Sequence, residues 1–209
     1  WPVFMGQVAM VLFATVDTFL VARYSAIDLA ALAVGTAAYI TVFIGLMGVV
    51  LACGPIVGQL YGARRLDAAG EQLHQAVWLA LGLSVLGCTV LALPQPFIAL
   101  SQASPEVEAK LRGHLLALAF ALPAGLLFAA YRGFNIAVSK PRAVMVLQLG
   151  ALAIKVPLAA LFVYGAGPVP ALGVVGCGVS TALATWCVAL IARQVMRRGA
   201  FHEAFAIFG

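Results

Sequence analysis

The sequence predicts an all-α integral membrane protein, and its composition is the first reason. Hydrophobic residues make up 64% of its 209 residues and charged residues only 9%, with a mean hydropathy of +1.09. Twelve basic and seven acidic side chains cannot form the charged shell of a soluble domain of this size. Three runs, 29–63, 75–104 and 156–192, contain no Lys, Arg, Asp, Glu or His. Each exceeds the roughly 20 residues that a helix needs to cross the hydrocarbon, and none alternates as a barrel strand would.

Turn residues and charges divide these runs into six expected transmembrane helices. Their approximate ranges are 1–22, 29–52, 73–93, 114–136, 142–164 and 171–192. Asp28 precedes the second range, and Pro94 and Pro96 follow the third. The Lys-Pro pair at 140–141 precedes the fifth range, and the Gly- and Pro-rich segment 165–170 precedes the sixth. The chain is therefore expected to form one six-helix transmembrane domain.

The distribution of basic residues between the loops predicts the orientation of these helices. One side carries Arg64, Arg65, Lys140, Arg142, Arg193, Arg197 and Arg198, and the other carries Arg23, Lys110 and Arg112. The side richer in Lys and Arg is expected in the cytoplasm, and the N-terminus with it. The net charge of +5 then follows from topology, and the scattered basic residues give no indication of nucleic-acid binding.

Asp17 is the only charged residue of the first range, and Lys155 is the only other charge placed deep in an expected helix. An ionised Asp at the bilayer centre costs about 2.5 to 3.5 kcal/mol on insertion scales. Asp17 lies six residues before Arg23 and Lys155 nine before Tyr164, so a rise of 1.5 Å per residue places them roughly 9 and 14 Å below the outer surface. Because pairing removes much of the burial cost, we predict that the two residues pair directly or through water.

Such a pair has a functional and a structural interpretation. Pro157 follows Lys155 by two residues, Pro2 lies upstream of Asp17, and both are expected to kink their helices. Distorted helices around intramembrane charges are typical of transporters, which favours an ion, proton or substrate pathway. The alternative is that the pair only fixes the first helix against the fifth.

Several short motifs occur in an order that resembles the multidrug and toxic compound extrusion (MATE) transporters, in particular their bacterial, NorM-like branch. The motifs are Pro2 and Gly6-Gln7 ahead of Asp17-Thr18, Leu29-Ala30-Ala31, Gly54-Pro55 with residues 58–63, Tyr131-Arg132-Gly133, Lys140-Pro141, Pro157, Tyr164-Gly165, and residues 170–178 with Thr181. The resemblance covers the whole chain. The chain also begins at Trp1 without an initiator Met or a signal peptide, so we expect further residues on both sides of it.

The resemblance implies that this chain is the N-terminal lobe of a twelve-helix exporter of the bacterial inner membrane. The C-terminal lobe is absent from this chain and is the expected partner of this lobe. Such proteins expel hydrophobic, often cationic compounds in exchange for protons or sodium ions and need no cofactor. We expect a monomer in the lipid bilayer. The candidate coupling residues are Asp17, Lys155 and Thr181. The candidate cavity residues are Phe4, Gln7, Phe13, Tyr39, Phe43, Phe128 and Tyr131.

The chain departs from the family at the fifth helix. Family members commonly carry Asn two positions before the helix proline, and Asn or Asp two positions after it. Lys155 and Ala159 occupy these places here, and residues four apart share a helix face. A fixed ammonium beside Asp17 would take the role of a bound sodium ion, which makes a sodium site at Asp17 doubtful. The hypothesis is that Lys155 is a tethered counter-ion and that a proton moving on Asp17 or Lys155 drives transport.

Other residues have simpler interpretations. Arg132 is expected to be a snorkelling anchor rather than a gate, and His74 and His114 to be helix-end residues rather than proton relays. The four cysteines lack metal-ligand spacing, and no motif of a hydrolase, metalloprotease or nucleotide-binding loop occurs, so neither a metal site nor an enzyme is predicted. Two alternatives to an exporter stay open: a flippase for a lipid-linked saccharide from the same broad superfamily, and a membrane module without transport activity.

Overall fold

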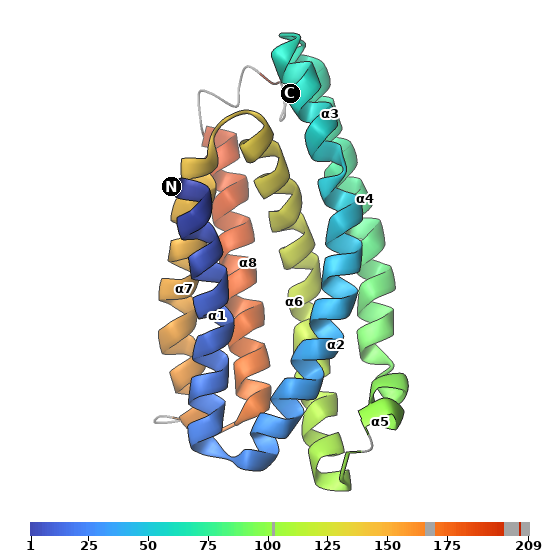
Figure 1. Cartoon of the computed structure of the whole chain (residues 1–209), viewed down its shortest axis with the longest axis vertical. Helices are drawn as coiled ribbons and strands as arrows, with labels where there is room; N and C mark the ends of the chain where they lie inside the picture. The colour runs from blue at the N-terminus through green and yellow to red at the C-terminus, as the bar shows by residue number, and fades with distance from the viewer. Residues whose placement is uncertain (102, 166–169, 199–204, 206–209) are drawn as a thin grey trace.

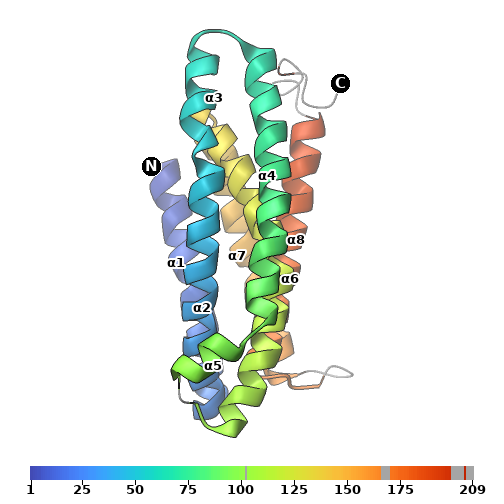
Figure 2. The same ribbon diagram turned by 90° about the vertical axis from the view of Figure 1, so that its right-hand side faces the viewer.

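The computed structural model describes residues 1–101, 103–165, 170–198 and 205, and in these ranges every regular element is a helix. The helices are α1 (Pro2–Tyr24), α2 (Ala26–Leu51), α3 (Cys53–Gly62), α4 (Leu66–Ala92), α5 (Gln95–Ser101), α6 (Pro105–Ala137), α7 (Pro141–Tyr164) and α8 (Val174–Arg198). Six helices of the described ranges are long and apolar enough to cross a membrane, with α2 and α3 counted as one. They run along the long axis of an elongated bundle (Figure 1), whereas α5 lies across it (Figure 2).

Several helices extend beyond the ranges expected from the sequence. Helix α4 begins at Leu66 instead of residue 73, α6 begins at Pro105 instead of 114, and α8 spans Val174–Arg198 instead of 171–192. Charged residues served as boundaries in that prediction. In a helix that continues beyond the lipid, charged residues occupy the end turns. Acidic side chains are stabilising near the N-terminus of a helix and basic side chains near its C-terminus. The first turns of α4 and α6 are acidic, and the last turn of α8 is basic.

Helix α6 is the centre of the bundle. It packs against α2, α4 and α8, while α7 packs against α1 and α8. Small residues allow these close approaches: a Cβ at Gly176 of α8 would lie 2.2 Å from the carbonyl oxygen of Phe162, so α7 and α8 touch there through their backbones. Pro123 and Pro157 lie inside α6 and α7, where each removes one backbone hydrogen bond. Pro2 is the first residue of α1 as the structure describes it, and the kink expected there stays a prediction.

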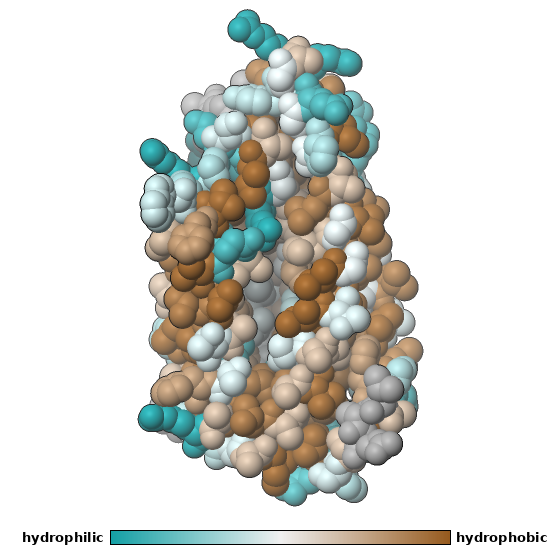
Figure 3. Space-filling view, in the orientation of Figure 1, coloured by the Kyte–Doolittle hydropathy of each residue, from teal (hydrophilic) through white to brown (hydrophobic). Residues whose placement is uncertain are grey.

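The outer surface of the bundle is apolar, as a lipid-facing surface requires. Large side chains such as Trp78 and Phe120 are 74% and 62% exposed. The space-filling view shows brown, hydrophobic residues along most of the length of the bundle, with most hydrophilic residues toward its two ends and one hydrophilic group near the middle of this face (Figure 3). This surface agrees with the all-α membrane fold predicted from composition.

A buried carboxylate, Asp28, joins three helices at one end of the bundle. It is fully buried, and its two oxygens accept from the backbone N–H of Val174 at 2.9 Å and from the ammonium of Lys110. Ser25 caps α2 by accepting from the backbone N–H of Asp28. Gly173 precedes α8 with a φ of +56°, and a Cβ there would collide with Asp28. The sequence pattern indicated only a helix boundary at Asp28, and this junction of α2, α6 and α8 was not predicted.

Candidate functional site

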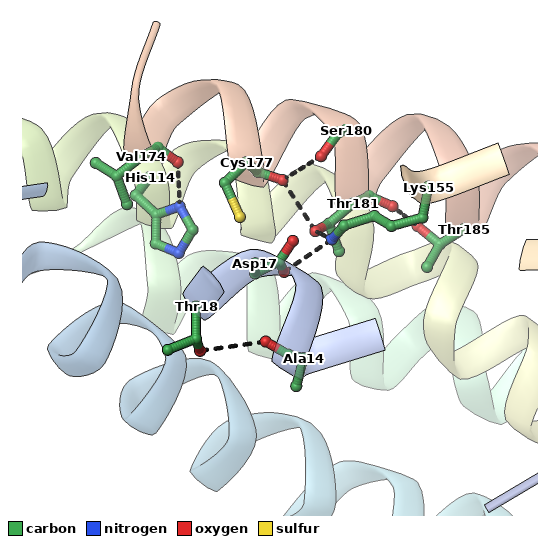
Figure 4. A network of polar contacts seen from close by, with 10 residues as sticks. All are labelled: Ala14, Asp17, Thr18, His114, Lys155, Val174, Cys177, Ser180, Thr181 and Thr185. Carbon is green, nitrogen blue, oxygen red and sulfur yellow. Dashed lines mark hydrogen bonds and ion pairs between the residues drawn. The ribbon is translucent and has the colours of Figure 1, made fainter. Parts of the chain in front are cut away.

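Asp17 of α1 and Lys155 of α7 form a direct ion pair in the interior of the bundle. The Lys155 Nζ donates to Asp17 Oδ2 at 2.8 Å and also to Thr181 Oγ1 of α8 (Figure 4). The Lys155 side chain is fully buried, and the Asp17 side chain is 15% exposed. The predicted pairing is therefore present without an intervening water, and it includes Thr181, the third residue expected at this site.

The Lys155 ammonium has a partner on each of three sides. Besides Asp17 and Thr181, the ring of Phe13 lies 4.1 Å from Nζ, a cation–π distance. The Thr181 hydroxyl donates to the carbonyl of Cys177 at 3.0 Å, so its lone pairs remain available to accept from Lys155. A buried ammonium needs such a set of partners, because an isolated charge in low dielectric is costly.

Asp17 keeps one oxygen without a hydrogen bond of ordinary geometry among the described residues. This Oδ1 is buried, and the thiol of Cys177 is a further polar group that interacts with the carboxylate. A carboxylate oxygen in this state is the place where a proton can bind without breaking the bond between Oδ2 and Lys155. The site thus combines a cation that is fixed to the protein with an acceptor atom that is free for protonation.

The two positions at which the chain departs from the MATE pattern face this interior. Lys155 and Ala159 lie one turn apart on α7, and both are fully buried. Ala159 brings no oxygen atom to the site. Among the contacts described above, the side-chain oxygens next to the ammonium come from Asp17 and Thr181. Nowhere in the described ranges do three or more His, Cys, Asp or Glu side chains gather in an arrangement that could hold a metal ion.

A cavity of about 190 Å³ lies beside the ion pair. It is lined by Ala9, Met10, Phe13, Tyr39, Phe43, Met47, Gly125, Phe128, Ala129, Arg132, Gln148, Ala151, Thr181, Thr185 and Val188. Four of the aromatic residues expected from the sequence, Phe13, Tyr39, Phe43 and Phe128, are in this lining. Phe13 and Thr181 contact both the cavity and Lys155, so they connect the two parts of the site.

Three other candidate cavity residues lie elsewhere. Gln7 lines a separate small crevice with Pro2, Tyr131 lines a groove formed by α4, α6 and α8, and Phe4 is 62% exposed on the outside of α1. A helix turns by about 100° per residue, so neighbours in the motif face different surfaces. The motifs therefore identified the helices around the cavity, but not the face of each helix that lines it.

The structure adds to the interpretation of Arg132 and changes that of His114. Arg132, expected to be a snorkelling anchor, also lines the cavity, with its Nη1 3.4 Å from the sulfur of Met10. Its spacing of four residues from Phe128 could have indicated this, because both share a helix face. His114, expected at a helix end, is only 1% exposed, and its Nδ1 lies 2.9 Å from the carbonyl oxygen of Val174. The reason is that α6 begins nine residues before His114 rather than at it.

Comparison with known proteins gives consistent results over nearly the whole chain. The MatE family model matches residues 2–161. The chain is 42% identical over 186 residues to the "Probable multidrug resistance protein NorM" of Aromatoleum aromaticum, which covers 89% of this chain and 40% of that protein. It is 35% identical over 198 residues to the "Multidrug resistance protein MdtK" of Edwardsiella ictaluri, covering 94% of this chain and 43% of that one.

Solved structures share the fold. The Vibrio cholerae MATE transporter VcmN in its bent form superposes with a TM-score of 0.85 at 20% identity, over 95% of this chain and 45% of that chain. The eukaryotic MATE transporter AtDTX14 superposes with a TM-score of 0.87 at 15% identity, over 98% of this chain and 45% of that one. The chain thus spans less than half the length of the relatives and structures that it matches.

Proposed function

Because the chain belongs to the MatE family, we propose that it forms one six-helix lobe of a secondary transporter that exports hydrophobic compounds across the bacterial inner membrane. The relatives at 42% and 35% identity carry the name of multidrug resistance proteins, which supports export of drug-like compounds. The observation that carries the proposal is an intramembrane ion pair next to an aromatic cavity. Intramembrane charges of this kind are expensive and mark transport pathways. The complete transporter contains a second lobe, and the N-terminus of this one lies in the cytoplasm.

The cavity supplies one wall of the substrate pathway. Its lining is mainly aromatic and aliphatic, and such surfaces bind compounds of different shape through apolar contact, with few polar groups to fix an orientation. Tyr39 and Phe43 stack with their ring centroids 5.4 Å apart and an interplanar angle of 9°. Hydrophobic aromatic compounds, cationic ones included, are the substrates that such a wall accommodates.

The ion pair supplies coupling through protonation of Asp17. In the unprotonated state, Lys155 neutralises Asp17 at 2.8 Å. A proton on Asp17 removes the negative charge and leaves a buried ammonium without its counter-ion, which is unfavourable in low dielectric. Helices α1 and α7 then repack relative to each other, and this repacking is the link between proton binding and access to the cavity. Sodium coupling at this site is disfavoured, because a sodium ion would have to replace an ammonium that is attached to the chain.

Transport by the complete protein in inside-out vesicles tests both parts of the proposal. With an imposed proton gradient, accumulation of a fluorescent hydrophobic cation is expected for the unmodified protein. Asp17→Asn is expected to abolish it, while Asp67→Asn, which changes an exposed Asp in the first turn of α4, leaves it intact. Equal membrane expression of the variants is the control. Absence of gradient-driven accumulation by the unmodified protein contradicts the transport proposal.

The coupling proposal has its own test. Lys155→Asn restores the residue that the family commonly carries at this position, and it removes the tethered cation. We expect the pH dependence of export to change and a dependence on sodium to appear or increase. If Lys155→Asn leaves efflux, its pH dependence and its sodium dependence all unchanged, Lys155 has no part in coupling.

A further inference from the structure

A groove of about 360 Å³ lies between α4 and α8, and α6 forms its floor. Both helices pack along α6, but within the described residues they have almost no contact with each other. Leu81 of α4 and Leu190 of α8 line the groove and are 38% and 58% exposed on the apolar outer surface. The groove therefore opens toward lipid. Because an empty apolar gap loses the contacts of the atoms that line it, a hydrocarbon chain is the occupant that this part of the groove favours.

The lining of the groove changes from apolar to cationic along the bundle. Leu81, Leu127 and Trp186 line its inner part, whereas His74 and Arg193 lie toward the N-terminal end of α4 and the C-terminal end of α8. These two ends lie at the same end of the bundle (Figure 1). Arg193 is exposed, and no ion pair among the described residues includes it. No Asp or Glu is in the described lining, so this end of the groove is complementary to an anion.

Tyr131 adds a buried polar group to the floor of the groove. Its side chain is only 2% exposed, and its hydroxyl makes no hydrogen bond to the part of the chain that the structure describes. Buried phenol groups usually have a partner, because an unpaired donor in an apolar environment is costly. A ligand that carries an oxygen acceptor beside its hydrocarbon chain would provide this partner.

We propose that the groove binds one acidic phospholipid from the adjacent leaflet, with its phosphate on Arg193 and an acyl chain along the floor. Arginine pairs with phosphate through parallel charge-assisted hydrogen bonds, and an ester oxygen of the lipid is an acceptor for Tyr131. Arg193 and Trp186 are seven residues apart, which is about 10 Å along α8. The groove thus reaches over much of the roughly 15 Å of hydrocarbon in one leaflet. The inference requires a membrane location but not transport activity.

The other candidate occupant is a transported hydrophobic compound. Phe128 lines both this groove and the aromatic cavity beside the ion pair, so its ring belongs to the wall between them. The cationic end of the groove favours the phospholipid, since a hydrophobic cation gains nothing from Arg193. Only a ligand with both an anionic group and a long chain uses the whole lining.

Native mass spectrometry of the complete transporter tests the proposal, because it counts bound lipids one at a time. The protein is stripped of lipid in detergent and titrated with dioleoyl-phosphatidylglycerol or with dioleoyl-phosphatidylcholine, which has the same chains but no net charge. We expect the first phosphatidylglycerol to bind about fivefold more tightly than the first phosphatidylcholine, the effect of one basic residue beside an anionic lipid. Glycerol phosphate, which has no acyl chain, is expected not to displace it.

Two variants locate the site. Arg193→Gln is expected to bring the affinities for the two lipids within a factor of about two of each other, by loss of phosphatidylglycerol binding. Ala189→Phe places a ring in the groove and is expected to weaken the first binding of both lipids about tenfold. Arg142→Gln is the control for Arg193→Gln, because it removes the same charge from an exposed residue that is not in the described lining.

The inference is overturned if the two lipids bind equally to the unmodified protein, or if the preference for phosphatidylglycerol survives Arg193→Gln. Displacement of the first phosphatidylglycerol by a fluorescent hydrophobic cation also overturns it, because the groove then holds a transported compound. Displacement by glycerol phosphate would show a simple phosphate site and overturn it as well. A protein that binds phosphatidylglycerol as expected but exports nothing contradicts the proposed function alone.

Discussion

Breaking the Asp17–Lys155 pair from one side is predicted to cost far more stability than removing both charges. Two unit charges 2.8 Å apart attract by about 6 kcal/mol at an effective dielectric of about 20, and burial of both groups offsets much of this attraction. Lys155→Met leaves Asp17 without its counter-ion. Asp17→Asn leaves the fully buried ammonium with a hydroxyl and an aromatic ring as partners. Each single change should therefore destabilise the protein by about 3 to 5 kcal/mol.

The double variant Asp17→Asn/Lys155→Met leaves no buried charge at the site. It should lose less stability than either single variant, because a buried ion pair is often no more stabilising than apolar residues of similar volume. The coupling energy of the double-mutant cycle is then about 3 kcal/mol or more. Reversible unfolding of the complete protein in mixed micelles with rising SDS, followed by fluorescence, measures all four free energies of unfolding.

A second cycle serves as the control. Arg112 is an exposed residue whose salt bridge is with Glu108 of its own helix, so Arg112→Met and Asp17→Asn should have additive effects. If the losses of the two single variants at Asp17 and Lys155 also add up in the double variant, the two charges do not stabilise each other and the argument for a buried ion pair fails.

The same unfolding assay tests two other features. Asp28→Ala should lower the free energy of unfolding by about 2 to 3 kcal/mol, because it leaves the buried N–H of Val174 without an acceptor. Asp28→Asn keeps an oxygen at this place and should lower it less. Equal losses of stability in the two variants would show that charge alone matters. Gly176→Ala should cost about 1 to 3 kcal/mol because its Cβ meets the backbone of Phe162, whereas Gly150→Ala, with nothing within 4 Å, should be neutral or stabilise by about 0.5 to 1 kcal/mol. Similar effects at both glycines would argue against close α7–α8 contact.

The sequence was sufficient to predict the helices and the central ion pair, for physical reasons. Lipid requires backbone groups to bond within the helix, so long uncharged runs indicate membrane helices directly. Asp17 and Lys155 were the only isolated charges at membrane depth, so the cost of burial pointed to a pairing between them although 138 positions separate them. The limited number of charges in this chain made a long-range contact predictable without an alignment.

The helix ends and the polar contacts near them were not predictable in the same way. A charge near an apolar run marks either the end of a helix or its continuation into water, and only packing distinguishes the two. His114 and Asp28 were therefore placed at ends, although neighbouring helices bury both. The face that each helix turns to the cavity depends on packing in the same way, which is why the Phe128 and Arg132 spacing was informative only once the cavity was known.

In the proposed mechanism, the tethered ammonium also determines how protons and substrates influence each other. A cation covalently held beside Asp17 acts at a high effective concentration, so a freely diffusing sodium ion competes poorly, whereas a proton binds Asp17 itself and removes its charge. Protonation then adds one positive charge to a site that already contains Arg132. A cationic substrate and this proton oppose each other, which is the relation that exchange requires. An anionic substrate and the proton favour each other's binding, by the reciprocity of linked equilibria. In the proposed mechanism, the charge of the substrate thus decides the sign of its coupling to Asp17, and Lys155 is the residue that favours protons over sodium ions at this site.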